Sequence, residues 1–181
     1  MPKQFQHAQD ARSQLLKGVD TLARVVGVTL GPNGRNVVLD RDFGLPQVCS
    51  DGVTIAKEIE LEDPFQNMGV QLVKLAASKT NDDVGDGTTT STVLAQGILR
   101  EGFKNVAAGA DPMVLKKGIE RAVQAIRAEV ESMARPVKGH DEIVRVAALA
   151  AHEEEMGELI AGVLETVGSQ GIVTVEESKG L

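Results

Sequence analysis

The 181-residue chain contains no tryptophan, no tyrosine and only four phenylalanines. This composition argues against a function in which bases or flat cofactors stack on aromatic rings. Hydrophobic residues nevertheless make up 42% of the chain, which is enough for a core in one domain or two small ones. We therefore expect an ordered protein whose core is built from aliphatic side chains.

Basic residues and cysteines are also few. Lys and Arg number 19 against 26 Asp and Glu, which gives a formal net charge of −7. The sequence contains no stripe of basic residues that could neutralise the phosphates of a nucleic acid. The single cysteine, Cys49, cannot form an internal disulfide, and no Cys and His spacing is typical of a zinc site. We expect a reducing compartment and no nucleic-acid partner.

Long apolar runs are missing as well. Residues 1–13 are too polar for a signal peptide, and no later segment is apolar over the length that spans a bilayer. These absences predict a soluble, cytoplasmic protein with no membrane partner.

Helical periodicity dominates what is present. Asp63-Pro64 and Asp111-Pro112 are typical helix starts, in which the aspartate caps the helix and the proline enters its first turn. The predicted fold is mainly α with a small β component. Its helices cover residues 9–26, 53–59, 64–79, 88–103, 112–135, 141–151 and 154–167, and its strands cover 35–40, 46–49 and 172–175, the first two forming a hairpin.

Two features bear on domain organisation. Pro136 ends the longest amphipathic stripe, so we predict a domain boundary there. The strand predicted over 172–175 begins close to the last residue and has no visible partner. We therefore expect the chain to be a fragment of a longer polypeptide.

The segment from Gly85 to Thr90 combines a carboxylate with the hydroxyl-rich start of a helix. The glycines allow a ligand to approach the backbone, and the free N–H groups of a helix start attract anions. Asp86 would repel a phosphate unless Mg²⁺ lay between them, which makes Asp86 the predicted metal ligand. Alternatively, Asp86 or Thr88 simply caps the helix, and the segment alone favours that alternative.

Two further loops could complete a phosphate pocket. The loop from Thr29 to Gly34 offers backbone N–H groups at Leu30 and Gly31, and the loop over residues 50–52 brings the carboxylate of Asp51. Asp51 could orient a water for attack on a terminal phosphate, or it could be a bare helix cap, which the residues alone favour. The G-x-x-x-x-G-K-[ST] motif is absent, so the common P-loop route to nucleotide binding is excluded.

Four long segments resemble the group I chaperonins of the GroEL type. They are TLGPNGRNVVLD, SDGVTIAKEIELEDPFQNMG, SKTNDDVGDGTTTSTVLAQ and NVAAGADPMVLKKGIERAV, and the similarity runs nearly end to end. Motifs of this length in this order are far more specific than a single glycine-rich loop. The resemblance therefore favours a nucleotide site over the two helix-cap alternatives.

The resemblance implies a subunit of an ATP-driven protein-folding machine. In that family, subunits with equatorial, intermediate and apical domains form a stacked double heptameric ring, which works with a co-chaperonin lid on unfolded client proteins. By that pattern, residues 1–136 are the N-terminal part of the equatorial, ATP-binding domain, and residues 137–181 are the first segment of the intermediate domain. The apical domain, which would bind clients and lid, is absent from this chain.

The resemblance also assigns the site residues. Asp86 would hold Mg²⁺, and Asp51 would assist hydrolysis, whereas the principal catalytic carboxylate is expected beyond Leu181. The residues implied to contact ATP are Thr29, Leu30, Gly31, Pro32, Ser50, Asp86, Gly87, Thr88, Thr89 and Thr90.

The chain departs from the family pattern at three places. Ser50 stands where the family usually has lysine, which removes a cation near the nucleotide. Ala150 stands where the family usually has a serine that contacts the nucleotide, so that contact is not carried over. Asp83-Val84 replaces a small apolar pair and adds a carboxylate near the expected metal, which we interpret as a solvated loop charge.

Two other functions stay open. The chain could be a non-catalytic helical module that joins or modulates chaperonin rings without hydrolysing ATP. It could also be an unrelated phosphoryl-transfer enzyme, for which His152 is the nearest candidate base. For the chain alone we expect poor stability and little or no activity, because its apolar helix stripes would lack partners.

Overall fold

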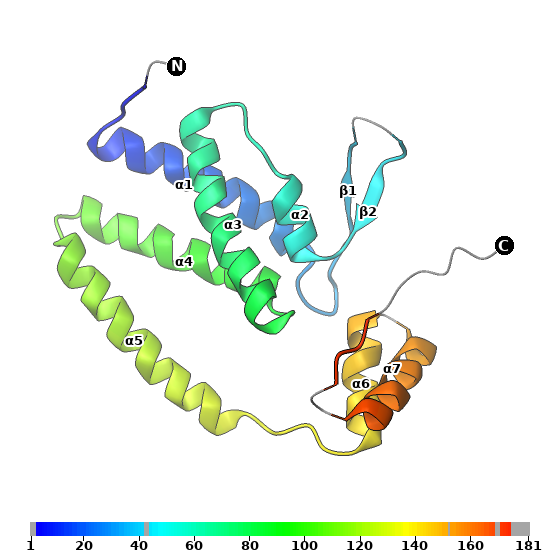
Figure 1. Cartoon of the computed structure of the whole chain (residues 1–181). Helices are drawn as coiled ribbons and strands as arrows, with labels where there is room; N and C mark the ends of the chain where they lie inside the picture. The colour runs from blue at the N-terminus through cyan, green and yellow to red at the C-terminus, as the bar shows by residue number, and fades with distance from the viewer. Residues whose placement is uncertain (1–2, 42–43, 152, 169–170, 175–181) are drawn as a thin grey trace. The chain divides into compact units, whose positions relative to one another are not determined.

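The computed structural model describes residues 3–41, 44–151, 153–168 and 171–174. It divides into two compact units, Met1–Glu120 and Arg121–Leu181, which we describe separately. No helix in the described part of the chain is both long enough and apolar enough to cross a membrane. In chain order the elements are α1 (Ala8–Gly27), β1 (Val37–Leu39), β2 (Gln47–Cys49), α2 (Gly52–Glu58), α3 (Pro64–Val84), α4 (Thr88–Ala107), α5 (Pro112–Met133), α6 (His140–Ala151) and α7 (Glu154–Val167) (Figure 1).

The predicted fold class, mainly α with a small β component, is confirmed. The two predicted helix starts are also seen, since Asp63 and Asp111 each accept two hydrogen bonds from backbone N–H groups of the helix that follows. The predicted hairpin forms, with β1 antiparallel to β2 and Val38 opposite Val48.

The end of α3 and the strand predicted over 172–175 differ from the prediction. Helix α3 continues to Val84 instead of ending near Lys79. The helix ends only at Gly85, whose φ of 73° is left-handed and whose N–H donates to Asn81 O at 2.8 Å. Residues 172–174 are not a strand in this structure, and Val175 lies outside the described residues.

The core of the first unit is aliphatic, as the composition predicts. Helix α3 crosses α1 and α4 in Figure 1. The buried core residues come from α1, β1, α2 and α3, and α4 packs against them with the partly buried Ala95 and Leu99. Burial of this apolar surface is the main force that holds the unit together. The core residues are Val19, Leu22, Val26, Leu39, Ile55, Ala56, Val70, Val73 and Ala77.

Two glycines let α1 and α3 approach closely. A Cβ atom at Gly18 would overlap the carbonyl oxygen of Gln66, and one at Gly69 would overlap the carbonyl oxygen of Leu15. Both glycines are buried. Any side chain at either position would therefore push the two helices apart.

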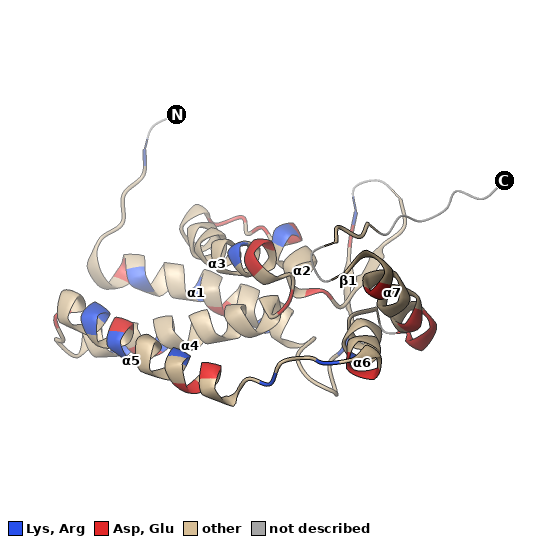
Figure 2. Ribbon diagram, turned by 60° about the horizontal axis from the view of Figure 1, so that its bottom comes forward, with Lys and Arg blue, Asp and Glu red and all other residues tan. Residues whose placement is uncertain are grey.

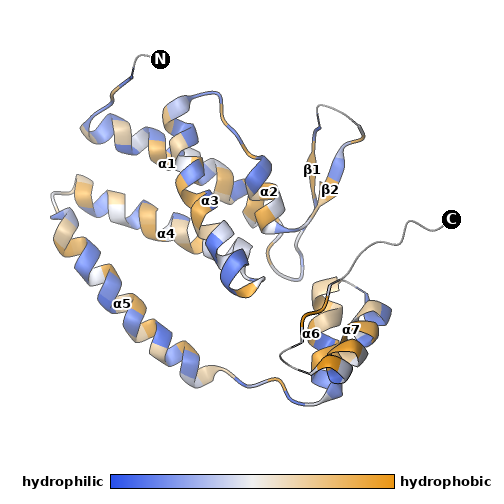
Figure 3. Ribbon diagram, in the orientation of Figure 1, coloured by the Kyte–Doolittle hydropathy of each residue, from blue (hydrophilic) through white to orange (hydrophobic). Residues whose placement is uncertain are grey.

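Helix α5 exposes its apolar residues. Not one of its residues is buried, and orange and blue segments alternate along its ribbon in Figure 3. The exposed fractions of Val123, Ile126 and Val130 are 50%, 62% and 58%. The periodic apolar stripe predicted from the sequence is therefore present but uncovered.

In the second unit, α6 packs against α7. Gly157 and Ala161 of α7 are buried, and a Cβ at Gly157 would overlap Ala148 of α6. Helix α7 carries four glutamates and no Lys or Arg, as the red segments in Figure 2 show. Small residues thus allow close helix packing while one face of α7 stays acidic.

His140 joins the two helices of this unit. Its Nε2 lies 3.0 Å from Glu158 Oε2, and its Nδ1 lies 2.9 Å from Glu165 Oε1. Both ring nitrogens can donate only when the imidazole is protonated. Hydrogen bonds to Glu158 and then Glu165 accordingly raise the pKa of His140 above its ordinary value of 6.5.

This raised pKa predicts that the second unit loses stability as pH rises. The contribution of His140 is fully present below its unfolded pKa of about 6.5 and is lost as pH rises through the higher folded pKa. We expect the thermal stability of the native protein to exceed that of His140→Gln at about pH 6 by more than at about pH 9. A difference that is equal at both pH values would contradict this role.

Candidate nucleotide site

The loop after α1 is a compact turn. Thr29 N donates to Val26 O at 3.1 Å, and Leu30 N donates to Gly27 O at 3.2 Å. Gly31 has a left-handed φ of 80°, and its N–H has no hydrogen-bond partner within the described part of the chain. The sequence predicted N–H donors at Leu30 and Gly31, but only Gly31 is available, because the turn itself uses the N–H of Leu30.

Asp51 caps helix α2. Its Oδ2 accepts hydrogen bonds from Thr54 N at 2.9 Å and from Thr54 Oγ1 at 2.5 Å. Its Oδ1 makes no hydrogen bond with the residues that the structure describes. Asp51 therefore caps a helix, which was one of the two roles that the sequence left open for it. The cap uses only one of the two carboxylate oxygens of Asp51.

The turn between α3 and α4 places two left-handed glycines around Asp86. Gly85 and Gly87 have φ of 73° and 80°, and Gly87 is the N-cap of α4 without any side-chain cap. Asp86 Oδ1 accepts from the adjacent Gly87 N at 2.6 Å and therefore does not cap the helix. The alternative that Asp86 or Thr88 caps α4 is wrong.

The start of α4 keeps free donors as a result. Its first helical hydrogen bond runs from Ser91 N to Gly87 O at 2.9 Å. The N–H groups of Thr88, Thr89 and Thr90 come before that bond and have no partner among the described residues. An uncapped helix start of this kind presents partial positive charge to an anion.

The three loops meet at Thr89. Its Oγ1 lies 3.3 Å from Thr29 Oγ1, although 60 residues separate the two threonines. A Cβ at Gly52 would overlap Thr89 Oγ1 and would lie 3.0 Å from both Thr89 N and Thr88 Oγ1. The structure thus brings together the loops of Thr29, Gly52 and Thr89, as a shared phosphate pocket requires.

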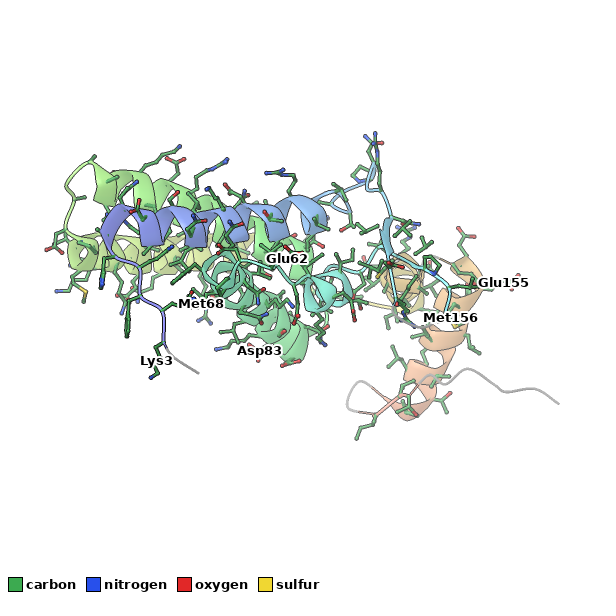
Figure 4. The ribbon with its side chains drawn as sticks, turned by 90° about the horizontal axis from the view of Figure 1, so that it is seen from above. Lys3, Glu62, Met68, Asp83, Glu155 and Met156 are labelled. Atoms are coloured by element: carbon green, nitrogen blue, oxygen red, sulfur yellow. The ribbon has the colours of Figure 1, made fainter. Side chains whose placement is uncertain are left out.

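Other predicted residues lie in the same loops without such contacts. Pro32, Ser50 and Thr90 are exposed, and the side chains of Ser50 and Thr90 make no hydrogen bond within the described ranges. Asp83 is exposed at the end of α3 (Figure 4), which agrees with a solvated charge. Ala150 lies on α6, in the second unit.

The local charge favours a cation together with any phosphate. Residues 80–99 contain Asp82, Asp83 and Asp86 but no Lys or Arg. Within the described residues, no group of three or more His, Cys, Asp or Glu side chains could hold a metal by itself. Mg²⁺ typically takes one or two carboxylates and fills its other positions with phosphate and water oxygens. Asp86 fits that role because its Oδ2 has no hydrogen-bond partner among the described residues.

Known proteins identify the family. The family model of the TCP-1/cpn60 chaperonin family matches residues 22–177. The chain belongs to the TCP-1/cpn60 chaperonin family.

Two solved chaperonins show the same fold. A group III chaperonin in the open state is 27% identical with a TM-score of 0.71 over 87% of this chain and 32% of its own. The chaperonin gp146 from bacteriophage EL 2 (Pseudomonas aeruginosa), crystallised in the presence of ATP-BeFx, is 27% identical with a TM-score of 0.74 over 87% of this chain and 28% of its own. The chain therefore spans about a third of the length of these structures.

Sequence reasoning missed two residues of this site. Gly52 was interpreted only as part of a loop, and Thr54 was given no role. The signal for Thr54 was weak, because the usual capping box pairs Ser or Thr with Glu or Gln three positions later, and Asp51 with Thr54 matches only its spacing. No sequence signal could have revealed the contact between Gly52 and Thr89.

The close approach at Gly52 predicts that Gly52→Ala disrupts the site. The added methyl would overlap Thr89 Oγ1 and crowd the α4 backbone, and such overpacking costs about 1–3 kcal/mol of unfolding free energy. Gly97→Ala is the matched control, because a Cβ there meets nothing within 4 Å and should stabilise the helix by about 0.5–1 kcal/mol. Chemical denaturation measures both, and equal stabilities of the two variants would refute the close contact.

Proposed function

We propose that this chain is the ATP-binding N-terminal part of a group I chaperonin subunit. The observation that carries the proposal is the meeting of Thr29, Gly52 and Thr89 beside the uncapped start of α4. Membership of the chaperonin family and the four motifs quoted above support it. The similarity to a chaperonin crystallised with ATP-BeFx is consistent with it.

Each loop has a part in the proposed site. The free N–H groups of Thr88, Thr89 and Thr90 bind phosphate oxygens, and Asp86 Oδ2 holds Mg²⁺. The ion, when bound, neutralises charge on the phosphates. Thr29, Leu30, Gly31 and Pro32 border the nucleotide from the turn after α1, and Ser50 supplies a hydroxyl instead of the usual cation.

Asp51 is proposed to assist hydrolysis. Its Oδ1 is unpartnered within the described residues. The next residue along the chain, Gly52, lies against the first residues of α4. A carboxylate oxygen there can accept a hydrogen bond from a water near the terminal phosphate. Full turnover is proposed for the complete protein, in which the resemblance implies a further, principal catalytic carboxylate.

The wider function is proposed for that complete protein. It assembles as a stacked double heptameric ring in the cytoplasm and couples ATP hydrolysis to the folding of client polypeptides. By the same resemblance, clients and the co-chaperonin lid bind to the apical domain of the complete protein. The exposed apolar stripe of α5 supports assembly, because uncovered apolar surface of this kind usually contacts other protein.

The same exposed stripe also suits the second candidate function. A helical module that joins or modulates chaperonin rings needs α5 but needs no nucleotide. Binding of Mg-ATP distinguishes the two functions, because the module predicts none.

For the ATP site, we predict that Asp86→Ala in the complete protein weakens Mg-ATP binding at least about tenfold, since a Mg²⁺ ligand is lost. Asp82→Ala is the matched control, because it removes the same charge from an exposed position on α3. Isothermal titration with Mg-ATP measures both variants. Unchanged affinity in Asp86→Ala, or an equal loss in Asp82→Ala, would refute the proposed metal ligand.

A further inference from the structure

Thr54 binds the same oxygen of Asp51 twice. It is the third residue of α2 and is half-buried. Its backbone N–H and its hydroxyl both donate to Asp51 Oδ2, at 2.9 and 2.5 Å. The hydroxyl distance lies in the short range of about 2.5–2.7 Å that is typical of O–H donors to a carboxylate.

These two bonds determine which way the carboxylate faces. A carboxylate bound by one donor can still turn about its Cβ–Cγ bond, because that torsion is soft. A second donor on the same oxygen restricts this rotation and leaves Oδ1 as the free acceptor. The helix cap needs only the backbone donor, so the hydroxyl is available for orientation.

The backbone next to this carboxylate is also held. Gly52 is buried against Thr88 and Thr89, at the proposed phosphate end of the site. The backbone position of Asp51 is therefore fixed. The direction in which its Oδ1 points then depends on the contact that Thr54 makes with Oδ2.

We propose that Thr54 is a positioning residue for hydrolysis, whose hydroxyl holds Asp51 Oδ2 so that Oδ1 faces the attacking water. This inference rests on the proposed function. In the reaction, the water oxygen bonds to the terminal phosphorus while the bond to the bridging oxygen breaks, and that oxygen keeps the electron pair in ADP. Asp51 Oδ1 accepts the hydrogen bond of the water, whose proton is released with inorganic phosphate.

The test separates orientation from structural support. Thr54→Val keeps the β-branched shape and the backbone cap but loses the hydroxyl, whereas Thr54→Ser restores it. Thr54→Cys gives a second comparison with a weak donor should the valine variant not fold. Asp51→Asn keeps an oxygen that can cap the helix and serves as the reference for loss of the carboxylate.

Steady-state ATP hydrolysis and Mg-ATP binding are measured on the complete protein. We expect Thr54→Val to lower kcat about five- to tenfold, with Kd for Mg-ATP changed less than about twofold. Thr54→Ser should return kcat to near the native value, and Asp51→Asn should lower kcat at least as much as Thr54→Val. This split between kcat and Kd is not expected of a merely structural contact.

Three results would overturn the proposal. Native kcat in Thr54→Val shows that the hydroxyl does not orient Asp51. A fall in kcat that is matched by weaker binding, or that Thr54→Ser shares, shows a structural role only. Absence of ATP hydrolysis in the native complete protein overturns this inference together with the proposed function. If the native protein hydrolyses ATP but removal of the Thr54 hydroxyl does not change kcat, only the inference is overturned.

Discussion

Helices α1 and α3 cross where Gly18 meets the backbone of Gln66 and Gly69 meets that of Leu15. Because neither glycine has a side chain, the helix backbones touch and their relative position is fixed at two points. The turn with Thr29 follows the end of α1, and the turn with Asp86 follows the end of α3. The crossing therefore determines where the two turns lie, and the aliphatic core maintains it.

The chemistry of the site follows from what these turns leave unpaired. Left-handed glycines on both sides of Asp86 turn the chain so that no side chain caps α4. Free N–H groups then lie next to a carboxylate in a segment without basic residues, which favours a phosphate only together with a cation. Asp51 serves a different purpose, because one oxygen caps α2 and the other has no hydrogen-bond partner in the part of the chain that the structure describes.

Much of this fold could be predicted from the sequence, because the apolar stripes and the Asp-Pro starts are local signals. The end of α3 could not, since Asn81 and Asp82 are typical of turns, yet the helix continues to Val84, where the left-handed Gly85 caps it. The sequence predicted that three loops form one pocket, and the structure brings Thr29, Gly52 and Thr89 together. The roles of the Leu30 N–H and of Thr54 depend on backbone geometry, which the spacing of residues in the sequence does not specify. The binding roles of the site residues stay predictions.

The central claim is that the start of α4 and Asp86 hold the phosphates and Mg²⁺. A structure of the complete protein with Mg²⁺ and a non-hydrolysable ATP analogue tests it most directly. The account predicts an Asp86 oxygen about 2.0–2.1 Å from Mg²⁺ and phosphate oxygens within hydrogen-bond distance of the N–H groups of Thr88, Thr89 and Thr90. A nucleotide bound away from these loops, or a metal that Asp86 does not contact, would contradict it.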